Sequence, residues 1–154
     1  MKAKPVVVVD TREKEPYAFD PARVEVVRRA IPAGDYSLSG LESSFAIERK
    51  SLEDFVGTVI RGRERFRREL LKLRECDFAC VVIEGSLMDV LTGSYRSDAH
   101  PNSVLGSILS IIVDYQIPVF FCANRQAARL FVEELLIKLS GKVDAICQQA
   151  KEEP

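Results

Sequence analysis

GDYSLSGLESSFAIERKSLED, residues 34–54, is the stretch on which the predicted fold depends. Gly34 and Gly40 are turn residues, and residues 35–38 and 45–50 have the length and apolar content of two short strands. If these strands pair as a hairpin, Asp35 and Glu48 lie close together. Because side chains alternate along a strand, Glu48 and Lys50 then share one face of the sheet and Arg49 points to the other.

Two carboxylates this close repel each other unless a cation separates them. Mg²⁺ takes oxygen ligands and is commonly held by one or two carboxylates together with substrate phosphates. Asp35 and Glu48 therefore indicate a divalent-cation site for phosphodiester hydrolysis, in which Lys50 orients or helps to deprotonate the attacking water. The alternative interpretation is a solvated strand face that carries a cross-strand charge pair.

The residues after Lys50 are typical of a helix start. Ser51-Leu52-Glu53-Asp54 has the form of a capping box, with Ser51 as the N-cap, and apolar residues then recur at helical spacing. Asp54 is accordingly expected either to support the site from outside the metal ligands or only to complete the cap.

The helix that follows Gly62 carries the main concentration of positive charge. Residues 61–74 contain seven basic and two acidic residues, a local net charge of +5 in a chain whose net charge is −1. Arginine pairs with phosphate through two hydrogen bonds, so we expect the arginines to grip a nucleic-acid backbone. They are Arg61, Arg63, Arg65, Arg67 and Arg68, with Arg61 and Arg63 expected nearest the hairpin. A solvated helix face is the alternative.

A buried first strand is predicted over residues 5–10, because four consecutive valines lead to Asp10. A carboxylate there is costly to bury unpaired, so Asp10 lies either at the exposed end of the strand or at a metal. Arg12 and Glu13 follow in the same loop. Glu13 is a candidate further acid, and Arg12 a candidate contact to phosphate or to the carboxylates.

The remaining pattern predicts strands over 24–29, 78–84 and 118–122, and helices over 87–91, 102–115 and 125–139. Asn102 and Asn124 are the expected caps of the last two helices, and His100 is expected to pack or cap rather than act as a general base. Gly141 is expected to end the last helix, so that a domain covers residues 1–141 and residues 142–154 form a frayed tail. This order predicts an α/β fold, with a mixed central sheet flanked by helices on both faces.

Composition is that of one globular domain: 154 residues, 47% hydrophobic, with a sequence pI of about 5.9. No apolar run reaches the roughly 18 residues of a membrane span. The N-terminus leads straight into a strand and leaves no room for a signal peptide. We therefore expect a cytoplasmic, nucleoid-associated protein, nuclear in a eukaryote, with no membrane partner. The four cysteines lack zinc-site spacing and are expected to be reduced.

Several motifs resemble one known family. Gly34-Asp35, a spacer, Glu48-Arg49-Lys50 and then Asp54 resemble the signature of the XPF/Hef family of structure-specific nucleases. Val9-Asp10-Thr11-Arg12-Glu13 is similar to that family's V-D-x-R-E segment. Further landmarks of the family are similar to Arg61-Gly62-Arg63, Glu84-Gly85 and His100-Pro101-Asn102. The resemblance runs from about Pro5 to Ser140, as a nuclease domain alone.

The resemblance implies a restriction-endonuclease-like fold and an endonuclease that uses Mg²⁺ or Mn²⁺ to cut branched, flap or fork DNA. It implies Asp10, Asp35 and Glu48 as metal ligands and Lys50 as a further catalytic residue. Arg12, Glu13, Arg49 and Asp54 are then supporting residues. A homodimer or heterodimer through the nuclease domain is also implied. The alternatives are a catalytically silent DNA-binding or dimerisation module, and a junction resolvase or nickase with the same metal core.

Overall fold

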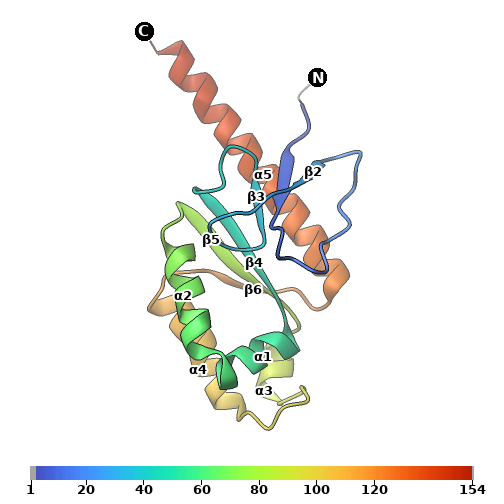
Figure 1. The fold of residues 1–154 in the computed structure, drawn as a ribbon, viewed down its shortest axis with the longest axis vertical. Coiled ribbons are helices and arrows are strands. Elements are labelled where there is room, and N and C mark those ends of the chain that lie inside the picture. The colour runs from blue at the N-terminus through green and yellow to red at the C-terminus, as the bar shows by residue number, and fades with distance from the viewer. Residues whose placement is uncertain (1–2, 154) are drawn as a thin grey trace.

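The fold is a six-stranded mixed sheet with helices on both faces (Figure 1). It is seen in a computed structural model that describes residues 3–153. The strands are β1 (Val6–Val9), β2 (Glu25–Arg28), β3 (Tyr36–Leu38), β4 (Phe45–Ser51), β5 (Phe78–Glu84) and β6 (Val119–Phe121). The helices are α1 (Leu52–Arg61), α2 (Arg63–Arg74), α3 (Leu87–Leu91), α4 (Pro101–Val113) and α5 (Arg125–Glu152).

The strand order places the predicted hairpin at the centre of the sheet. The order is β2-β1-β3-β4-β5-β6. β3 runs antiparallel to both of its neighbours, β1 and β4, whereas the pairs β1–β2, β4–β5 and β5–β6 are parallel. The mixed sheet expected from the sequence is therefore confirmed, and β6 lies at one edge.

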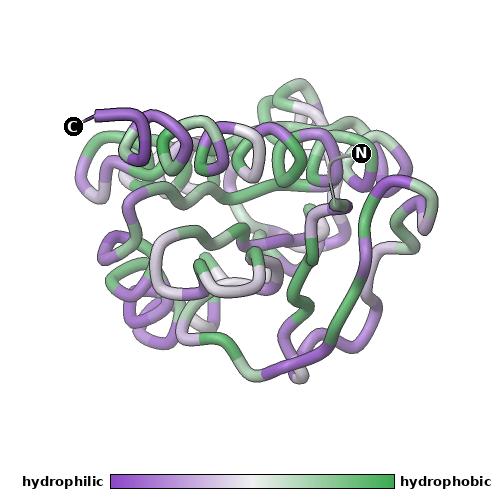
Figure 2. Tube along the Cα trace, turned by 90° about the horizontal axis from the view of Figure 1, so that it is seen from above, coloured by the Kyte–Doolittle hydropathy of each residue, from purple (hydrophilic) through white to green (hydrophobic). Residues whose placement is uncertain are grey.

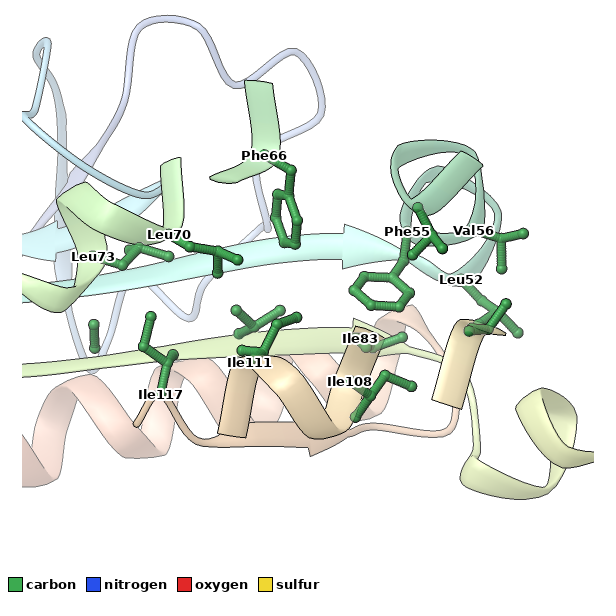
Figure 3. Packing of buried hydrophobic residues seen from close by; sticks show 14 of the residues in the cluster. Leu52, Phe55, Val56, Phe66, Leu70, Leu73, Ile83, Ile108, Ile111 and Ile117 are labelled. Carbon is green, nitrogen blue, oxygen red and sulfur yellow. The ribbon is translucent and has the colours of Figure 1, made fainter. Parts of the chain in front are cut away.

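Each face of the sheet has its own apolar core. β5 shows why: Val81 and Ile83 pack with α1, α2 and α4, and Cys80 and Val82 pack with α5. A strand covered on both faces needs a continuous apolar run, and β5 has one. Figure 3 shows the first core, in which Phe55, Phe66 and Ile111 meet from three helices, and Figure 2 shows α5 along one side of the molecule.

The last helix is longer than predicted. α5 continues through Gly141 to Glu152, so the predicted end at Gly141 and the frayed tail are wrong as far as residue 152. A helical glycine costs about 1 kcal/mol relative to alanine, and the good helix formers that follow, such as Ala145 and Gln148, offset this cost. Pro154 lies outside the described residues. Within residues 3–153, no helix is both long and apolar enough to cross a membrane.

The helix caps differ from prediction at one position. The Ser51 hydroxyl accepts a hydrogen bond from the Asp54 N–H at 3.1 Å, as the sequence indicates for the start of α1. α4 is capped by His100 rather than Asn102, because His100 Nδ1 accepts from the Asn102 N–H at 3.1 Å. Pro101 then occupies the first turn, where its missing N–H costs nothing. His100 is thus a capping residue.

Candidate active site

The β3–β4 hairpin brings Asp35 beside Glu48. Tyr36 pairs with Ile47 across the two antiparallel strands, so the preceding Asp35 lies opposite Glu48. The Asp35 N–H donates to the Ile47 carbonyl at 2.8 Å, and Asp35 Oδ2 accepts from the Arg49 N–H at 2.8 Å. The predicted proximity of the two acids is therefore confirmed, and the backbone of β4 itself orients one of them.

Gly34 permits this close approach of the two strands. Its φ is +74°, a conformation that residues with a Cβ rarely adopt. A Cβ at this position would also lie 3.0 Å from the Ile47 carbonyl oxygen and 3.2 Å from Ala46 Cβ. Both constraints act just before Asp35, so the geometry of the acid pair requires glycine here.

The acid pair opens into a polar cavity of about 190 Å³, called here the acid cavity. Asp10 joins Asp35 and Glu48 in its wall. Charged side chains from the first loop and from α2 also line it: the basic Arg12, Arg65 and Lys72 and the acidic Glu69. The acid cavity thus combines carboxylates with cations that can accept a phosphate.

Burial makes the charged forms of both acids unfavourable. Loss of hydration raises the pKa of Glu48 well above its usual range, and the neighbouring Asp35 raises it further. Burial likewise raises the pKa of Asp35 to about 7, although the hydrogen bond from the Arg49 N–H opposes the change. Lys50 lowers the pKa of each acid. A bound cation would favour the two carboxylates far more strongly than this single ammonium group does.

Lys50 lies next to Glu48, on the face predicted for it. Its Nζ is 3.8 Å from Glu48 Oε1 and 5.1 Å from the centre of the Phe66 ring. It lines a second cavity of about 530 Å³ together with Asp54, Arg61 and Arg65. Arg65 lines the acid cavity as well, so the two cavities adjoin along α2.

Asp10 is held differently from the other two predicted ligands. Its Oδ2 accepts from Arg12 Nε at 2.8 Å and its Oδ1 from the Ile31 N–H at 3.1 Å, so both oxygens are engaged. Among residues 3–153, no three His, Cys, Asp or Glu side chains are grouped so that they could hold one metal ion. The structure thus places all three predicted ligands in the wall of one cavity, with Asp35 and Glu48 opposite each other and Asp10 bonded to Arg12 and Ile31.

Arg49 points to the opposite face of the sheet and anchors a network there. Its guanidinium donates to both carboxylate oxygens of Glu84, at 2.8 and 2.9 Å, and the Tyr17 hydroxyl donates to the same carboxylate at 2.6 Å. Burial alone would raise the pKa of Glu84, but these hydrogen bonds lower it below the usual value. Glu13, a predicted supporting acid, lies 3.7 Å from Arg49 on this side.

Sequence reasoning did not assign roles to Tyr17 or Glu84. The position of Glu84 could have indicated a role, because an acid at the end of a buried strand also drew attention to Asp10. Tyr17 lies in a loop between prolines, where no periodicity marks it.

The five arginines predicted to bind a backbone do not share one surface. Arg61 and Arg65 face the cavities beside Lys50, whereas Arg63 and Arg67 face α4. Arg63 was expected to lie nearest the hairpin, and this prediction is wrong. Arg65 lies beside Asp35 and Glu48 instead. Arg68 is exposed and lines none of these cavities. Of the five, only Arg65 forms a salt bridge within the described residues, with Glu69 at 3.8 Å.

Comparison with known proteins identifies the family. The ERCC4 domain matches residues 9–135 of this chain. The chain belongs to the ERCC4 domain family. The resemblance to XPF-type nucleases and the restriction-endonuclease-like fold are thereby confirmed.

Individual relatives agree with this assignment. The ERCC4 domain is 31% identical over 140 residues to a Methanocaldococcus jannaschii protein that bears the name of an ATP-dependent RNA helicase; the alignment covers 90% of this chain but 16% of that protein. It also resembles XPF from Aeropyrum pernix, with a TM-score of 0.69 and 25% identity over 88% of this chain and 61% of that one. XPF from the same organism in complex with DNA gives a TM-score of 0.68 and 26% identity, covering 90% and 66%.

Proposed function

We propose that this ERCC4 domain is an endonuclease that hydrolyses phosphodiester bonds of DNA with the aid of Mg²⁺ or Mn²⁺. The observation that carries the proposal is the pair of a buried Glu48 and a half-buried Asp35, which lies beside Lys50 and opens into a cavity that Arg12, Arg65 and Lys72 also line. Two adjacent carboxylates fit a hard divalent cation whose other ligands are water and phosphate oxygens. The DNA complex of an XPF relative supports the choice of substrate.

Asp35 and Glu48 would hold the metal, and the other side chains would prepare the phosphate and the water. When bound, such a cation stabilises charge on phosphoryl oxygens and lowers the pKa of water. Lys50, close to Glu48, would orient the attacking water or stabilise the developing charge. Arg65 and Arg61 would hold the DNA backbone next to the acids. Asp10 would act through Arg12, to which it is bonded, and Asp54 through the start of α1.

The substrate proposed is branched DNA, as the family implies. The test is cleavage of flap, fork, four-way junction and linear duplex DNA, with Mg²⁺, with Mn²⁺ and with EDTA. We expect metal-dependent cleavage that favours a branched substrate. Inactivity of the wild-type chain on all four DNAs would overturn the proposal and favour a catalytically silent module, and preferential junction cleavage would indicate a resolvase.

Isosteric variants test the site itself. Asp35→Asn and Glu48→Gln keep the shape of the side chain but remove its charge, and Lys50→Met removes the ammonium group. Each should lower the cleavage rate by at least about 100-fold, the scale of losing one catalytic group. Glu75→Gln, an exposed acid beyond α2, is the matched control and should retain full activity. Wild-type rates in Asp35→Asn or Glu48→Gln would rule out the site.

We also propose that two copies of this chain form a dimer through α4 and the sheet edge at β6. α4 contacts β6, the last strand of the sheet, and α4 exposes Leu109, Ile112 and Val113. An exposed strand edge beside apolar side chains is suited to pairing with another chain. Sedimentation should show a dimer that Ile112→Glu dissociates, while Ile146→Glu on the far end of α5 has no effect. A monomeric wild-type chain would overturn the homodimer.

A further inference from the structure

A third cavity lies on the other side of α2, away from the acid cavity. It is a groove of about 490 Å³ between α2 and α4, called here the α2–α4 groove. Its apolar lining comes from the first core, including Phe66 and Ile111, which Figure 3 shows approaching each other from α2 and α4. Its polar lining includes Arg63, Glu64 and Arg67 on α2 and Ser103, Ser107 and Ser110 on α4.

The α2 wall of this groove carries uncompensated positive charge. Arg63, Arg67 and Arg74 follow the i, i+4, i+11 spacing of one helix face and extend over roughly 16 Å. The Arg74 guanidinium lies 5.7 Å from the centre of the Tyr115 ring, at one end of the groove. Within residues 3–153, neither Arg63 nor Arg67 forms a salt bridge, although Glu64 also lines the groove. In the lining itself, Arg63 and Arg67 therefore outweigh the single acid, Glu64.

α2 thus divides its positive charge between two surfaces. Arg65 and Lys72 face the acid cavity, and Arg63 and Arg67 face the α2–α4 groove. The first set lies where DNA at the acids would contact it, and the second set lines a separate groove. The second set is available to another segment of phosphate backbone, and near a branch point DNA offers more than one such segment.

We propose that the α2–α4 groove binds a second segment of DNA backbone while the acid cavity takes the strand to be cut. Arginine side chains are common donors to phosphate, and such contacts fix the position of DNA without reading its sequence. The unpaired arginines favour phosphate over a protein partner as the occupant. This inference rests on the proposed function and adds to it a physical basis for the choice of branched DNA.

The test compares fork and linear DNA binding by the Arg63→Ala/Arg67→Ala variant. Glu48→Gln is present in every protein to prevent cleavage, and the probes are a fluorescein-labelled fork and a linear duplex of equal length. We expect the arginine variant to bind the fork roughly tenfold more weakly than the chain with Glu48→Gln alone, because two charged contacts are lost. The slope of log K against log salt should fall by roughly 1.4–1.8 for the fork. Linear duplex binding should change less than about twofold.

The control is Lys138→Ala/Lys142→Ala, which removes two exposed cations from α5 on the opposite face of the sheet and should leave both probes unaffected. Unchanged fork affinity and salt slope in the arginine variant would overturn the proposal. Equal losses on fork and linear DNA would also overturn it, because the groove would then belong to the path of the cut strand. A changed oligomeric state with unchanged DNA binding would identify the groove as a protein interface instead.

Cleavage distinguishes this failure from failure of the proposed function. If a chain with Glu48 restored cuts DNA but the arginine variant keeps the wild-type preference for forks, only the groove proposal fails. If the wild-type chain cuts no DNA, the proposed function fails, and the binding comparison still decides whether the groove holds a second backbone segment.

Discussion

Asp35 and Glu48 are each unfavourable as charged groups in the positions they occupy. Glu48 is buried and Asp35 half-buried, and their pKa values are raised by loss of hydration and, for Glu48, by its neighbour Asp35. A hairpin that existed only for stability would place apolar residues at these positions. The pair therefore makes the metal-free chain sensitive to protons in a way that an experiment can measure.

The first prediction concerns pH and the stability of the metal-free chain. Burial raises the pKa of Asp35 from 3.8 to about 7 in the folded state. Between pH 3.8 and about 7, Asp35 is therefore more protonated in the folded state than in the unfolded state. The stability that this protonation contributes is complete below about pH 4 and is lost as the pH rises through 7. In EDTA, Asp35→Asn should gain roughly 1–3 kcal/mol relative to wild type between pH 5 and pH 8, measured by urea unfolding. A constant difference between the two proteins would contradict the shift.

The second prediction separates two reasons for glycine at position 34. Gly34 and Gly40 both have positive φ, but a Cβ would clash only at Gly34, where the Ile47 carbonyl lies 3.0 Å away. Gly40→Ala should therefore cost about 1 kcal/mol of unfolding free energy through φ alone. Gly34→Ala should cost more and should also weaken cleavage, because the strand that carries Glu48 must shift. Equal costs in chemical denaturation would mean that the close contact is not important.

At the scale of elements, β4 presents candidate site residues on one face and a structural ion-pair network on the other. Glu48 lines the acid cavity and Lys50 the cavity that adjoins it, whereas Arg49 joins Glu84 and Tyr17 on the other side of the sheet. The network closes the loop after β1 against β4 and β5, because Glu13 also lies close to Arg49. The position of the acids thus depends on contacts made behind the sheet.

The third prediction tests that dependence. Glu84→Gln leaves the Arg49 guanidinium with a neutral partner in a site where both side chains are about nine-tenths buried. We expect a loss of about 1–3 kcal/mol in unfolding free energy, together with a lower cleavage rate and little change in DNA affinity. Tyr17→Phe, which removes one hydrogen bond to Glu84, should cost about 1 kcal/mol. Full stability in Glu84→Gln would show that the network does not hold β4.

The elements could be predicted where hydrophobic periodicity is strong. The alternation in β4 and the helical spacing after Ser51 gave the hairpin, the first helix and the faces of Glu48, Lys50 and Arg49. The prediction failed where a local signal competes with its surroundings. Gly141 is a common stop signal, but its helical neighbours carry α5 past it. The His100 cap could not be distinguished from an Asn102 cap, because both residues can accept the hydrogen bond.

For the molecule as a whole, the sequence predicted which residues make up the candidate site. It did not predict which of them have other partners or which surface of α2 each arginine occupies. Asp10, Asp35 and Glu48 do line one cavity, yet Asp10 has both oxygens engaged by Arg12 and Ile31. The arginines of α2 separate onto two surfaces because a helix turns about 100° per residue. Which side faces the acids depends on how α2 packs on the sheet, and that is a property of the tertiary structure.

The fourth prediction links metal binding to the stability of the whole domain. A cation that binds only the folded chain stabilises it by about 2.7 kcal/mol at a concentration 100 times its Kd. Millimolar Mn²⁺ or Mg²⁺ should therefore raise the Tm of the wild-type chain by several degrees. Glu75→Gln should show the same rise and Glu48→Gln almost none, in a calorimetric scan. An equal rise in Glu48→Gln would place the bound ion elsewhere.

The hydrogen bond from the Arg49 N–H to Asp35 has a consequence for genetics. The donor belongs to the main chain, so every replacement at codon 49 except proline preserves it, whatever happens to the guanidinium. Saturation mutagenesis at this codon will consequently test the contacts of the Arg49 guanidinium with Glu84 and Tyr17. It will not test the hydrogen bond to the Asp35 carboxylate. Revealing that second role requires chemical synthesis, in which an ester linkage replaces the amide before residue 49 and leaves every side chain unaltered.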